Sequence, residues 1–350
     1  MTVETTAPAE SGTASSNPCV RMTGSGEPEQ HIVAGGTDRP TAGRGQVVVE
    51  VEAAGVSYAE VQMLQHLHPF PPAFPFVPGY DLVGRITETG SGVTGFRVGD
   101  RVAAMPRQGA WQKYAAVPAK GLASVPEGMD AAVAVSLVTN GVTAYQMLHR
   151  LARSQPGDTV LVHGASGGVG TLVTQLAVHH GVRVIGTASP AKHAAVRALG
   201  AEPLDYRTPA LVDAVRELAP NGVQAVFDHV GGRGLDDSWA MLADDGTLVS
   251  FDSSVAGYLP GQWFRPHVPA LRRTVVRFFA RLLRLTRRRQ TMYYVKPGPD
   301  FHTDLAALYR LVDEGVLQPR IAGRHALDGA GGAVRALLEG STVGKHVLIP

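Results

Sequence analysis

A glycine-rich turn at residues 165–170 has the composition of a dinucleotide-binding loop. The segment LVHGASGGVG runs from a predicted strand, Val160 to His163, into a predicted helix that starts near Gly170. Gly167 would let the backbone approach a pyrophosphate, whose charge is met by amides at the helix N-terminus, and Gly170 would let the helix pack closely on the strand. A second predicted strand, Val182 to Thr187, closes a βαβ unit. The alternative is a glycine-rich turn that binds nothing. We expect these residues to bind the diphosphate: Ala165, Ser166, Gly167, Gly168, Val169 and Gly170.

The residue at the end of the second strand indicates which coenzyme is bound. Enzymes that use NAD place an acid there, about 20 positions past the last glycine, to bind the ribose hydroxyls. Here the position is Ser189, Lys192 follows it, and a further predicted strand ends at Tyr206 and Arg207. A hydroxyl and two cations could bind a 2′-phosphate, with no carboxylate to repel it. This pattern predicts NADPH, unless Lys192 and Arg207 are only solvated surface charges.

The elements that must position this loop fall into two groups, which differ in the periodicity of their apolar residues. From Gln46 onward short β-branched strands alternate with glycine turns, which is typical of an antiparallel, barrel-like unit. After about Asn140 each short apolar strand is followed by a helix, which predicts a parallel sheet covered by helices. The fold class is therefore α/β. The predicted ranges are a disordered tail at 1–17, a substrate domain at 18–138 and 301–350, and a nucleotide domain at 139–300 with a basic helical insertion at 262–290.

Composition excludes several other classes of protein. The chain has 350 residues, enough for two domains, and its net charge of +2 gives no reason to expect nucleic acid as a partner. Cys19 is the only cysteine, so an internal disulfide and any site with two thiolates are excluded. The chain shows no run of 18 apolar residues and no basic N-terminal region, so we expect a cytoplasmic protein.

Several motifs, in order along the chain, resemble those of one superfamily. They are AAGVSYAEV (53–61), VPGYDLVGRI (77–86), VGDRV (98–102), TNGVTAYQML (139–148), ASGGVG (165–170), TASPAK (187–192), LDYR (204–207) and VGKHVLIP (343–350). Together they resemble the medium-chain dehydrogenase/reductase superfamily, and within it the zinc-independent quinone oxidoreductase and enoyl reductase branch. The resemblance implies a GroES-like β-barrel substrate domain, a doubly wound Rossmann domain that binds NADPH, and a homodimer. It also implies hydride transfer to a small-molecule quinone or α,β-unsaturated carbonyl compound.

The resemblance also implies that there is no metal site. Zinc-dependent relatives hold the metal with a cysteine and a histidine, and the corresponding positions here are Ser57 and Tyr80. An improvised site remains conceivable, because histidines and acids have the chemistry of metal ligands. Its candidate residues are Glu60, His66, His68 and Asp81.

The candidate catalytic residues lie where this chain departs from its relatives. Those relatives carry a GVNFxD stretch and a GxYP segment, whereas here Ser57 stands for the Asn, Glu60 for the Asp and His68 for the Tyr. His68 could donate a proton at neutral pH, which makes it our first candidate, and Tyr58 is the second. Either side chain could instead only pack in the core.

Four further residues resemble those that line the coenzyme cleft of relatives. They are Ser57, Asn140, Thr143 and Lys345, and for Lys345 a solvated side chain is the commoner case.

The arginine-rich segment at 262–290 predicts an amphipathic cationic helix. On a helical wheel Arg273, Arg277, Arg281, Arg284 and Arg288 share one side, and Val275, Phe278, Phe279, Leu282 and Leu283 share the other. The helix could dock on an anionic surface, either a membrane or a carrier protein, or it could roof the substrate pocket. The interpretation we favour is that its apolar side packs on its own domain or on a twin subunit, with the arginines in solvent.

Three other functions fit the same sequence. An enoyl reductase acting on thioester or polyketide intermediates would use the basic helix to bind its carrier. A non-redox biosynthetic enzyme could keep the same fold. An NADPH-binding protein without turnover would explain the departures at Ser57, Glu60 and His68. Consumption of NADPH separates the reductases from the other two.

Overall fold

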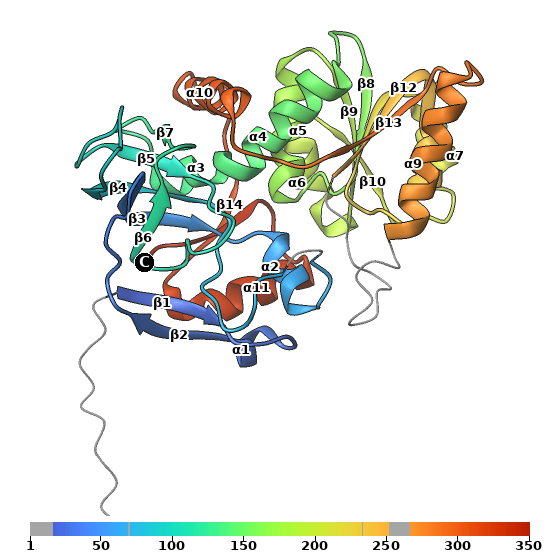
Figure 1. Ribbon diagram of the computed structural model, residues 1–350. Coiled ribbons are helices and arrows are strands. Elements are labelled where there is room, and N and C mark those ends of the chain that lie inside the picture. The colour runs from blue at the N-terminus through green and yellow to red at the C-terminus, as the bar shows by residue number, and fades with distance from the viewer. Residues whose placement is uncertain (1–16, 69–70, 233, 252–266) are drawn as a thin grey trace, which may run out of the picture.

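The computed structural model describes residues 17–68, 71–232, 234–251 and 267–350. Two sheets lie in separate halves of the molecule (Figure 1). One contains strands from the middle of the chain, and the other combines strands from the first third with two strands from the C-terminal end. The α/β fold class predicted from the sequence is confirmed.

The middle of the chain forms a six-stranded parallel sheet in the order β10-β9-β8-β11-β12-β13. Its inner strands β8, β9, β11 and β12 are largely buried on both faces because helices cover both, as expected for parallel strands. The direction in which successive strands are added reverses between β8 and β11. In such sheets ligands bind beyond the carboxyl ends of the strands at the reversal point. The strands are β8 (Thr159–Val162), β9 (Arg183–Ala188), β10 (Glu202–Asp205), β11 (Val223–Asp228), β12 (Leu242–Phe251) and β13 (Arg289–Tyr293). The connecting helices are α5 (Gly168–His179), α6 (His193–Ala198), α7 (Leu211–Leu218), α8 (Gly234–Met241) and α9 (His267–Leu282).

The other sheet joins the two ends of the chain. Its order is β14-β15-β3-β4-β5-β7, with β6 paired to β3, and every pairing is antiparallel except β14 with β15. The pairing of β15 with β3 carries the C-terminal strand to the end of β3. The strands are β3 (Gln46–Gly55), β4 (Leu82–Thr89), β5 (Arg101–Ala104), β6 (Tyr114–Pro118), β7 (Ala123–Ser124), β14 (Ile321–His325) and β15 (Lys345–Leu348).

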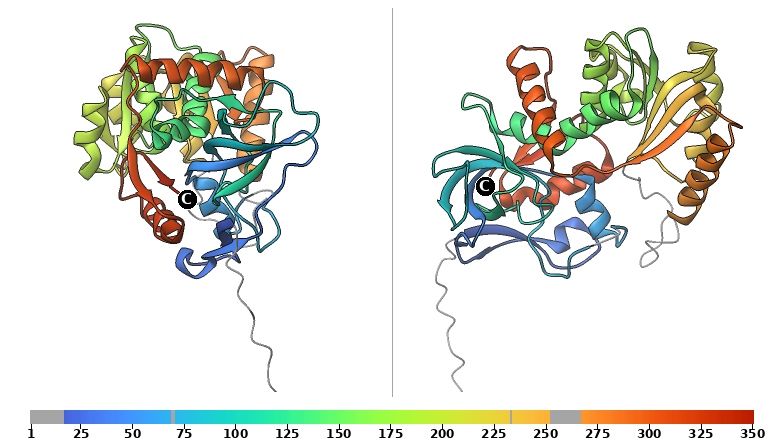
Figure 2. Two further views of the ribbon diagram at one scale, coloured as in Figure 1. Left: turned by 90° about the vertical axis from the view of Figure 1, so that its left-hand side faces the viewer. Right: turned by 45° about the horizontal axis from the view of Figure 1, so that its top comes forward.

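A long helical run connects the two sheets, and α10 (Pro299–Asp313) packs beside it (Figures 1 and 2). The run consists of α3 (Ala131–Ser136), η1 (Leu137–Gly141), α4 (Val142–Tyr145) and η2 (Gln146–Ala152). Among the described residues, Ala131–Ala152 is the one helix long and apolar enough to cross a membrane, with 22 residues and a mean hydropathy of 1.3. Because 67% of its apolar window is buried inside the protein, it has the character of a core helix.

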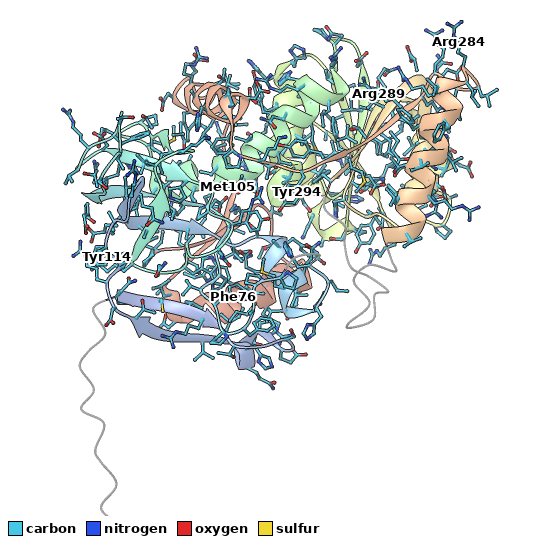
Figure 3. All side chains as sticks on the ribbon, in the orientation of Figure 1. Phe76, Met105, Tyr114, Arg284, Arg289 and Tyr294 are labelled. Carbon is cyan, nitrogen blue, oxygen red and sulfur yellow. The ribbon has the colours of Figure 1, made fainter. Side chains whose placement is uncertain are left out.

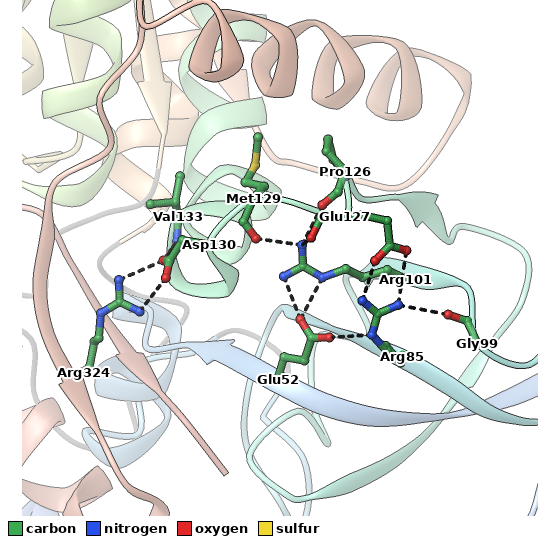
Figure 4. Close-up of polar contacts among 10 residues, drawn as sticks. All are labelled: Glu52, Arg85, Gly99, Arg101, Pro126, Glu127, Met129, Asp130, Val133 and Arg324. Atoms are coloured by element: carbon green, nitrogen blue, oxygen red, sulfur yellow. Dashed lines mark hydrogen bonds and ion pairs between the residues drawn. The ribbon is translucent and has the colours of Figure 1, made fainter.

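A buried arginine fixes the antiparallel sheet to the start of this run (Figure 4). The Arg101 guanidinium is paired with Glu52 at 2.7 Å and donates to the carbonyls of Pro126 and Met129 at 2.6 and 2.7 Å. On the surface beside it, Arg85 bridges Glu52 and Glu127. The loop that leads into α3 is thereby held against β3 and β5.

The predicted N-terminal tail ends one residue too late. Asn17 starts β1 (Asn17–Met22), which pairs with β2 (Ile32–Thr37), and its side chain is fully buried. Its amide donates to Gln112 Oε1 at 2.9 Å and to the Tyr114 carbonyl at 3.0 Å, so it is part of the fold. The remainder of the predicted tail, residues 1–16, lies outside the described residues.

The arginine-rich helix is shorter than predicted. α9 ends at Leu282, so Arg284 and Arg288 lie beyond it, and Arg289 already begins β13. Residues 262–266 of the predicted helix lie outside the described residues.

The apolar side of α9 does not pack on its own domain, whereas its packing on a twin subunit stays a prediction. Arg273 and Arg277 turn toward their own domain, where both pair with Asp236 at 2.9 and 2.7 Å, and Arg277 lies over the ring of Trp239. Arg272 and Arg281 are exposed, and so are the large apolar side chains of α9 and of the residues just after it. These apolar side chains form what we call the apolar face of α9: Leu271, Val275, Val276, Phe278, Phe279, Leu282, Leu283 and Leu285.

Candidate functional site

The glycine-rich turn has the geometry that a diphosphate requires. α5 begins at Gly168, two residues earlier than predicted, and the turn before it follows the carboxyl end of β8. A Cβ on Gly170 would lie 2.1 Å from the carbonyl oxygen of Gly164, so only glycine allows the helix to approach the strand this closely. The first turn of this 12-residue helix presents backbone amides with no partner inside the helix, and such amides bind phosphate.

Two other elements meet the turn. A Cβ on Gly168 would lie 2.3 Å from the Asn140 amide nitrogen, so the side chain of Asn140 rests against the first turn of α5. The amide of Gly344 donates to the Ser166 carbonyl at 3.0 Å, which joins the loop to the residue before β15. The turn, η1 and the C-terminal strand therefore meet at one place.

Lys345 is the centre of a polar cluster at that place. Its side chain is 2% exposed, and its ammonium lies 3.1 Å from Asp81 Oδ2, 3.5 Å from Ser57 Oγ and 3.5 Å from Asn140 Oδ1. The alternative of a solvated lysine is wrong. The structure thus brings together Ser57, Asn140 and Lys345 as predicted. The ion pair with Asp81 was not predicted, since Asp81 had been considered only as a metal ligand.

Glu60 is a second carboxylate beside this cluster, and it is fully buried. It lies in the first turn of α2 (Tyr58–Leu64), where its Oε2 accepts the Ser57 amide at 2.8 Å in a capping box. Oε1 has no hydrogen-bond partner. Burial raises the pKa of Glu60 to about 7, partly opposed by the Ser57 amide and the charge of Lys345 and assisted by the charge of Asp81. The sequence did not identify Glu60 as a group whose pKa lies near neutral pH.

Thr143 and Tyr80 contact residues at and just after the end of β13. Thr143 is buried, and its hydrogen bond to Tyr293 partly opposes the rise that burial causes in the pKa of that tyrosine. The hydroxyl of Tyr80 contacts that of Tyr294, which Figure 3 labels at the junction of the two sheets. Burial and this hydrogen bond raise the pKa of Tyr80, so it stays a neutral phenol.

The residues predicted to bind a 2′-phosphate are only partly assembled. Ser189 directly follows β9 and precedes the short helix η3 (Pro190–Lys192), so it lies beside Lys192. The Lys192 ammonium donates to the carbonyls of Gly340 and Thr342, and burial lowers its pKa, so the alternative of a fully solvated lysine is wrong.

Arg207 is already engaged by a carboxylate that the prediction overlooked. Its Nε lies 3.0 Å from Oδ1 of Asp205, the last residue of β10, and the neighbouring Tyr206 is 55% exposed. The expectation that no carboxylate lies near this position is therefore wrong. Of the residues predicted to bind the 2′-phosphate, Ser189 and Lys192 are therefore the stronger candidates.

The candidate catalytic residues His68 and Tyr58 lie in and just after α2. His68 is 8% exposed and its backbone amide donates to the Gln62 carbonyl at 3.2 Å, while Tyr58 is half-buried against the main core. Nothing in these contacts tests a catalytic role, so both stay predictions. Among the described residues no three His, Cys, Asp or Glu side chains are grouped to hold a metal ion.

A buried polar network below the glycine turn was also missed. His163 ends the LVH segment after β8, and its ring nitrogens lie 3.2 Å from Thr187 Oγ1 and 3.1 Å from Ser238 Oγ. Ser238 in turn donates to Asp228 at the end of β11. Burial lowers the pKa of His163, which favours a neutral imidazole. The signal was present, because polar residues at the carboxyl ends of neighbouring parallel strands converge.

Comparisons with known proteins agree with this architecture. Residues 43–127 match the family model of the alcohol dehydrogenase GroES-like domain, and residues 199–348 match that of the zinc-binding dehydrogenase family. The human synaptic vesicle membrane protein VAT-1 homolog is 32% identical over 320 residues, covering 89% of this chain and 80% of that protein. A 2-haloacrylate reductase from a Burkholderia species is 30% identical over 316 residues, covering 88% of this chain and 92% of that one.

Solved structures share the whole fold. A mycobacterial protein complexed with NADPH superposes with a TM-score of 0.83 at 32% identity, covering 96% of this chain and all of that chain. A mycobacterial quinone oxidoreductase gives a TM-score of 0.78 at 33% identity with the same coverage. With the GroES-like sheet, the doubly wound nucleotide sheet and relatives that match along nearly its full length, this chain belongs to the medium-chain dehydrogenase/reductase superfamily.

Proposed function

We propose that the protein is an NADPH-dependent reductase that acts on a quinone or an α,β-unsaturated carbonyl compound without zinc. The observation that carries the proposal is the meeting of the glycine turn, Asn140 and the buried Lys345 at one place beyond the carboxyl ends of the parallel strands. Two comparisons support it. The mycobacterial structure at 32% identity contains NADPH, and the Burkholderia relative is named for reduction of an acrylate, whose double bond is conjugated to a carboxyl group.

When bound, NADPH supplies hydride from its nicotinamide ring to an electron-poor carbon. The amides of the glycine turn hold its diphosphate, and Ser189 and Lys192 hold the 2′-phosphate. Asn140, Thr143 and Ser57 would lie beside the nicotinamide, and the Lys345 ammonium, which is paired with Asp81, would offer an N–H donor there. His68 or Tyr58 would donate the proton that the substrate needs.

The residues at the zinc positions of relatives have other partners here. Ser57 Oγ accepts a hydrogen bond from Lys345, and the Tyr80 hydroxyl contacts Tyr294. A hydroxyl and a neutral phenol are much weaker zinc ligands than thiolate and imidazole. Polarisation of the substrate carbonyl would therefore fall to hydrogen-bond donors, among them the Lys345 ammonium.

We also propose a cytoplasmic location, with a small molecule as substrate and no nucleic acid partner. Most of the apolar helix Ala131–Ala152 is buried in the core between the sheets. A net charge of +2 supplies little attraction for a polyanion such as nucleic acid.

The proposed activity predicts consumption of NADPH when the enzyme meets a conjugated acceptor. We expect a panel of quinones and enones to oxidise NADPH, followed by its absorbance, with tighter binding of NADPH than of NADH by calorimetry. Tight binding of NADPH without consumption across the panel would favour a non-redox enzyme or a binding protein. Acyl thioesters in the same panel test the enoyl reductase alternative. If neither coenzyme bound, the whole proposal would be wrong.

Replacement of Lys192 tests which coenzyme the protein prefers. In Lys192→Ala the dissociation constant of NADPH should rise about tenfold to hundredfold, because one charge-assisted contact to the 2′-phosphate is lost, whereas that of NADH stays unchanged. Lys120→Ala removes one exposed lysine elsewhere and should change neither constant.

We propose that a second copy of the chain covers the apolar face of α9. β13 is the last strand of its sheet and, among the described strands, pairs with β12 alone, so its outer edge is open next to α9 (Figure 1). An open edge can pair with its own symmetry copy, and the adjacent apolar side chains would be buried at the same time. Phe278 is 62% and Leu282 64% exposed, and such clustered apolar groups usually mark an interface.

Disruption of this face should give a monomer. Phe279→Asp combined with Leu282→Asp places two charges in the proposed interface, and we expect light scattering to change from the mass of two chains to that of one. Val98→Asp, at an exposed position on the other half of the molecule, is the control and should stay dimeric. A wild-type protein that is already monomeric would contradict the proposal and leave a membrane or a carrier protein as the occupant.

A further inference from the structure

A pocket of about 330 Å³ opens between the end of η2, α9 and the first residues of β13. β13 runs parallel to the other strands of its sheet, and Arg289 is its first residue. The pocket therefore lies at the amino ends of the strands, whereas the glycine turn follows the carboxyl end of β8. Figure 3 labels Arg289 at this place and Arg284 farther out, beyond the end of α9. The pocket is thus separate from the coenzyme site.

Arginine dominates the lining of this pocket, and no carboxylate takes part in it. The sequence around it also lacks negative charge, since residues 253–299 contain no Asp or Glu. The lining arginines are Arg150, Arg153, Arg277, Arg281, Arg288 and Arg289.

Carboxylates outside the pocket neutralise only half of these arginines. The paired ones are Arg150 with Asp304 at 2.7 Å, Arg277 with Asp236 at 2.7 Å and Arg288 with Asp244 at 3.7 Å. Among the described residues, Arg153, Arg281 and Arg289 have no carboxylate partner.

Backbone carbonyls satisfy part of what remains. Arg289 donates to the Leu151 carbonyl at the C-terminal end of η2, and Arg281 donates to the Arg287 carbonyl at 2.9 Å. Each guanidinium has five N–H donors, so most donors of these two residues are left over. The groups are also near enough to repel one another. Burial lowers the pKa of Arg289, and the charges of Arg281 and Arg153 lower it further. Three like charges are held together with no counter-charge.

We propose that this pocket binds a phosphate-bearing anion with at least two negative charges. Several guanidinium groups around one space can each offer paired N–H donors to phosphate oxygens, which is the geometry that favours arginine over lysine for phosphate. The anion is either a soluble phosphorylated molecule or the headgroup of an anionic phospholipid. The second source is included because one apolar side chain that could contact an acyl chain, Phe278, lines the same pocket.

The test uses the full-length protein saturated with NADPH, so that the coenzyme site cannot bind the probe. Inorganic pyrophosphate is titrated by calorimetry into wild type, into Arg153→Gln/Arg281→Gln, and into the control Arg272→Gln/Arg284→Gln. Both double variants lose two positive charges, but Arg272 and Arg284 are exposed residues that do not line the pocket. We expect pyrophosphate to bind at least about tenfold more weakly to the pocket variant and nearly normally to the control.

Vesicles provide the second arm, which separates the two sources of phosphate. Sedimentation is compared for vesicles of phosphatidylcholine alone and of phosphatidylcholine mixed with phosphatidic acid. Binding of the mixed vesicles that is lost in the pocket variant but kept in the control would support a lipid headgroup, and the same pattern with pyrophosphate alone would support a soluble ligand. The proposal is wrong if wild type binds neither probe, or if the two variants lose binding equally. NADPH affinity, measured separately, reports whether the coenzyme site and the fold are intact.

Discussion

Replacing Lys345 by methionine is expected to lower the free energy of unfolding by about 3–5 kcal/mol, because Asp81 would be left as an unpaired charge in the core. Both side chains are almost fully buried and lie 3.1 Å apart. Once the ammonium is removed, Asp81 retains only the Thr139 amide at 3.2 Å. Urea unfolding of the coenzyme-free protein measures the loss.

The double variant Lys345→Met/Asp81→Asn separates the ion pair from other causes of instability. It leaves no buried charge, and the carbonyl oxygen of the substituted side chain can still accept the Thr139 amide, so we expect most of the lost stability to return. Its NADPH affinity then reports on the loss of the Lys345–Asp81 pair in a stable protein. A stable double variant that binds NADPH as tightly as wild type would show that the ammonium acts only in folding. If the double variant were as unstable as Lys345→Met, the ion pair would not be the cause.

The glycine turn could be located from the sequence because all of its parts are local. The strand, the glycines and the helix follow one another within residues 159–179, so neighbouring residues fix their own geometry. The Lys345–Asp81 pair is different, because 264 positions separate its members. It exists only because β15 pairs with β3, and no local pattern predicts that pairing.

Helix α9 shows a second limit of reading a sequence. The wheel correctly separates arginines from apolar residues, but it does not say which side faces the protein. Arg273 and Arg277 turn inward because Asp236 and Trp239 on α8 offer a carboxylate and an aromatic face there. The usual rule that apolar groups face inward fails here because the partners lie on another element of the chain.

Glu60 should make the protein less stable as pH rises from about 4.5 to 7. Its pKa is about 7 in the folded protein and 4.5 when unperturbed, so the folded state binds the proton more tightly than the unfolded state. The stabilisation is complete below pH 4.5 and is lost as the pH passes through 7. Because one pKa unit corresponds to about 1.4 kcal/mol, the expected loss is about 3 kcal/mol.

Glu60→Gln should remove this slope and make the protein more stable than wild type at pH 8, by up to about 3 kcal/mol. The variant carries no charge to bury, and glutamine can still accept the Ser57 amide in the capping box. The measurement is urea unfolding at intervals between pH 4.5 and 8, with the exposed Glu339→Gln as a control that should follow wild type. If wild type and Glu60→Gln had parallel pH profiles, the carboxyl group would already be ionised at low pH in the folded protein. Lys345 would then outweigh burial, and Glu60 would hold no proton near neutral pH.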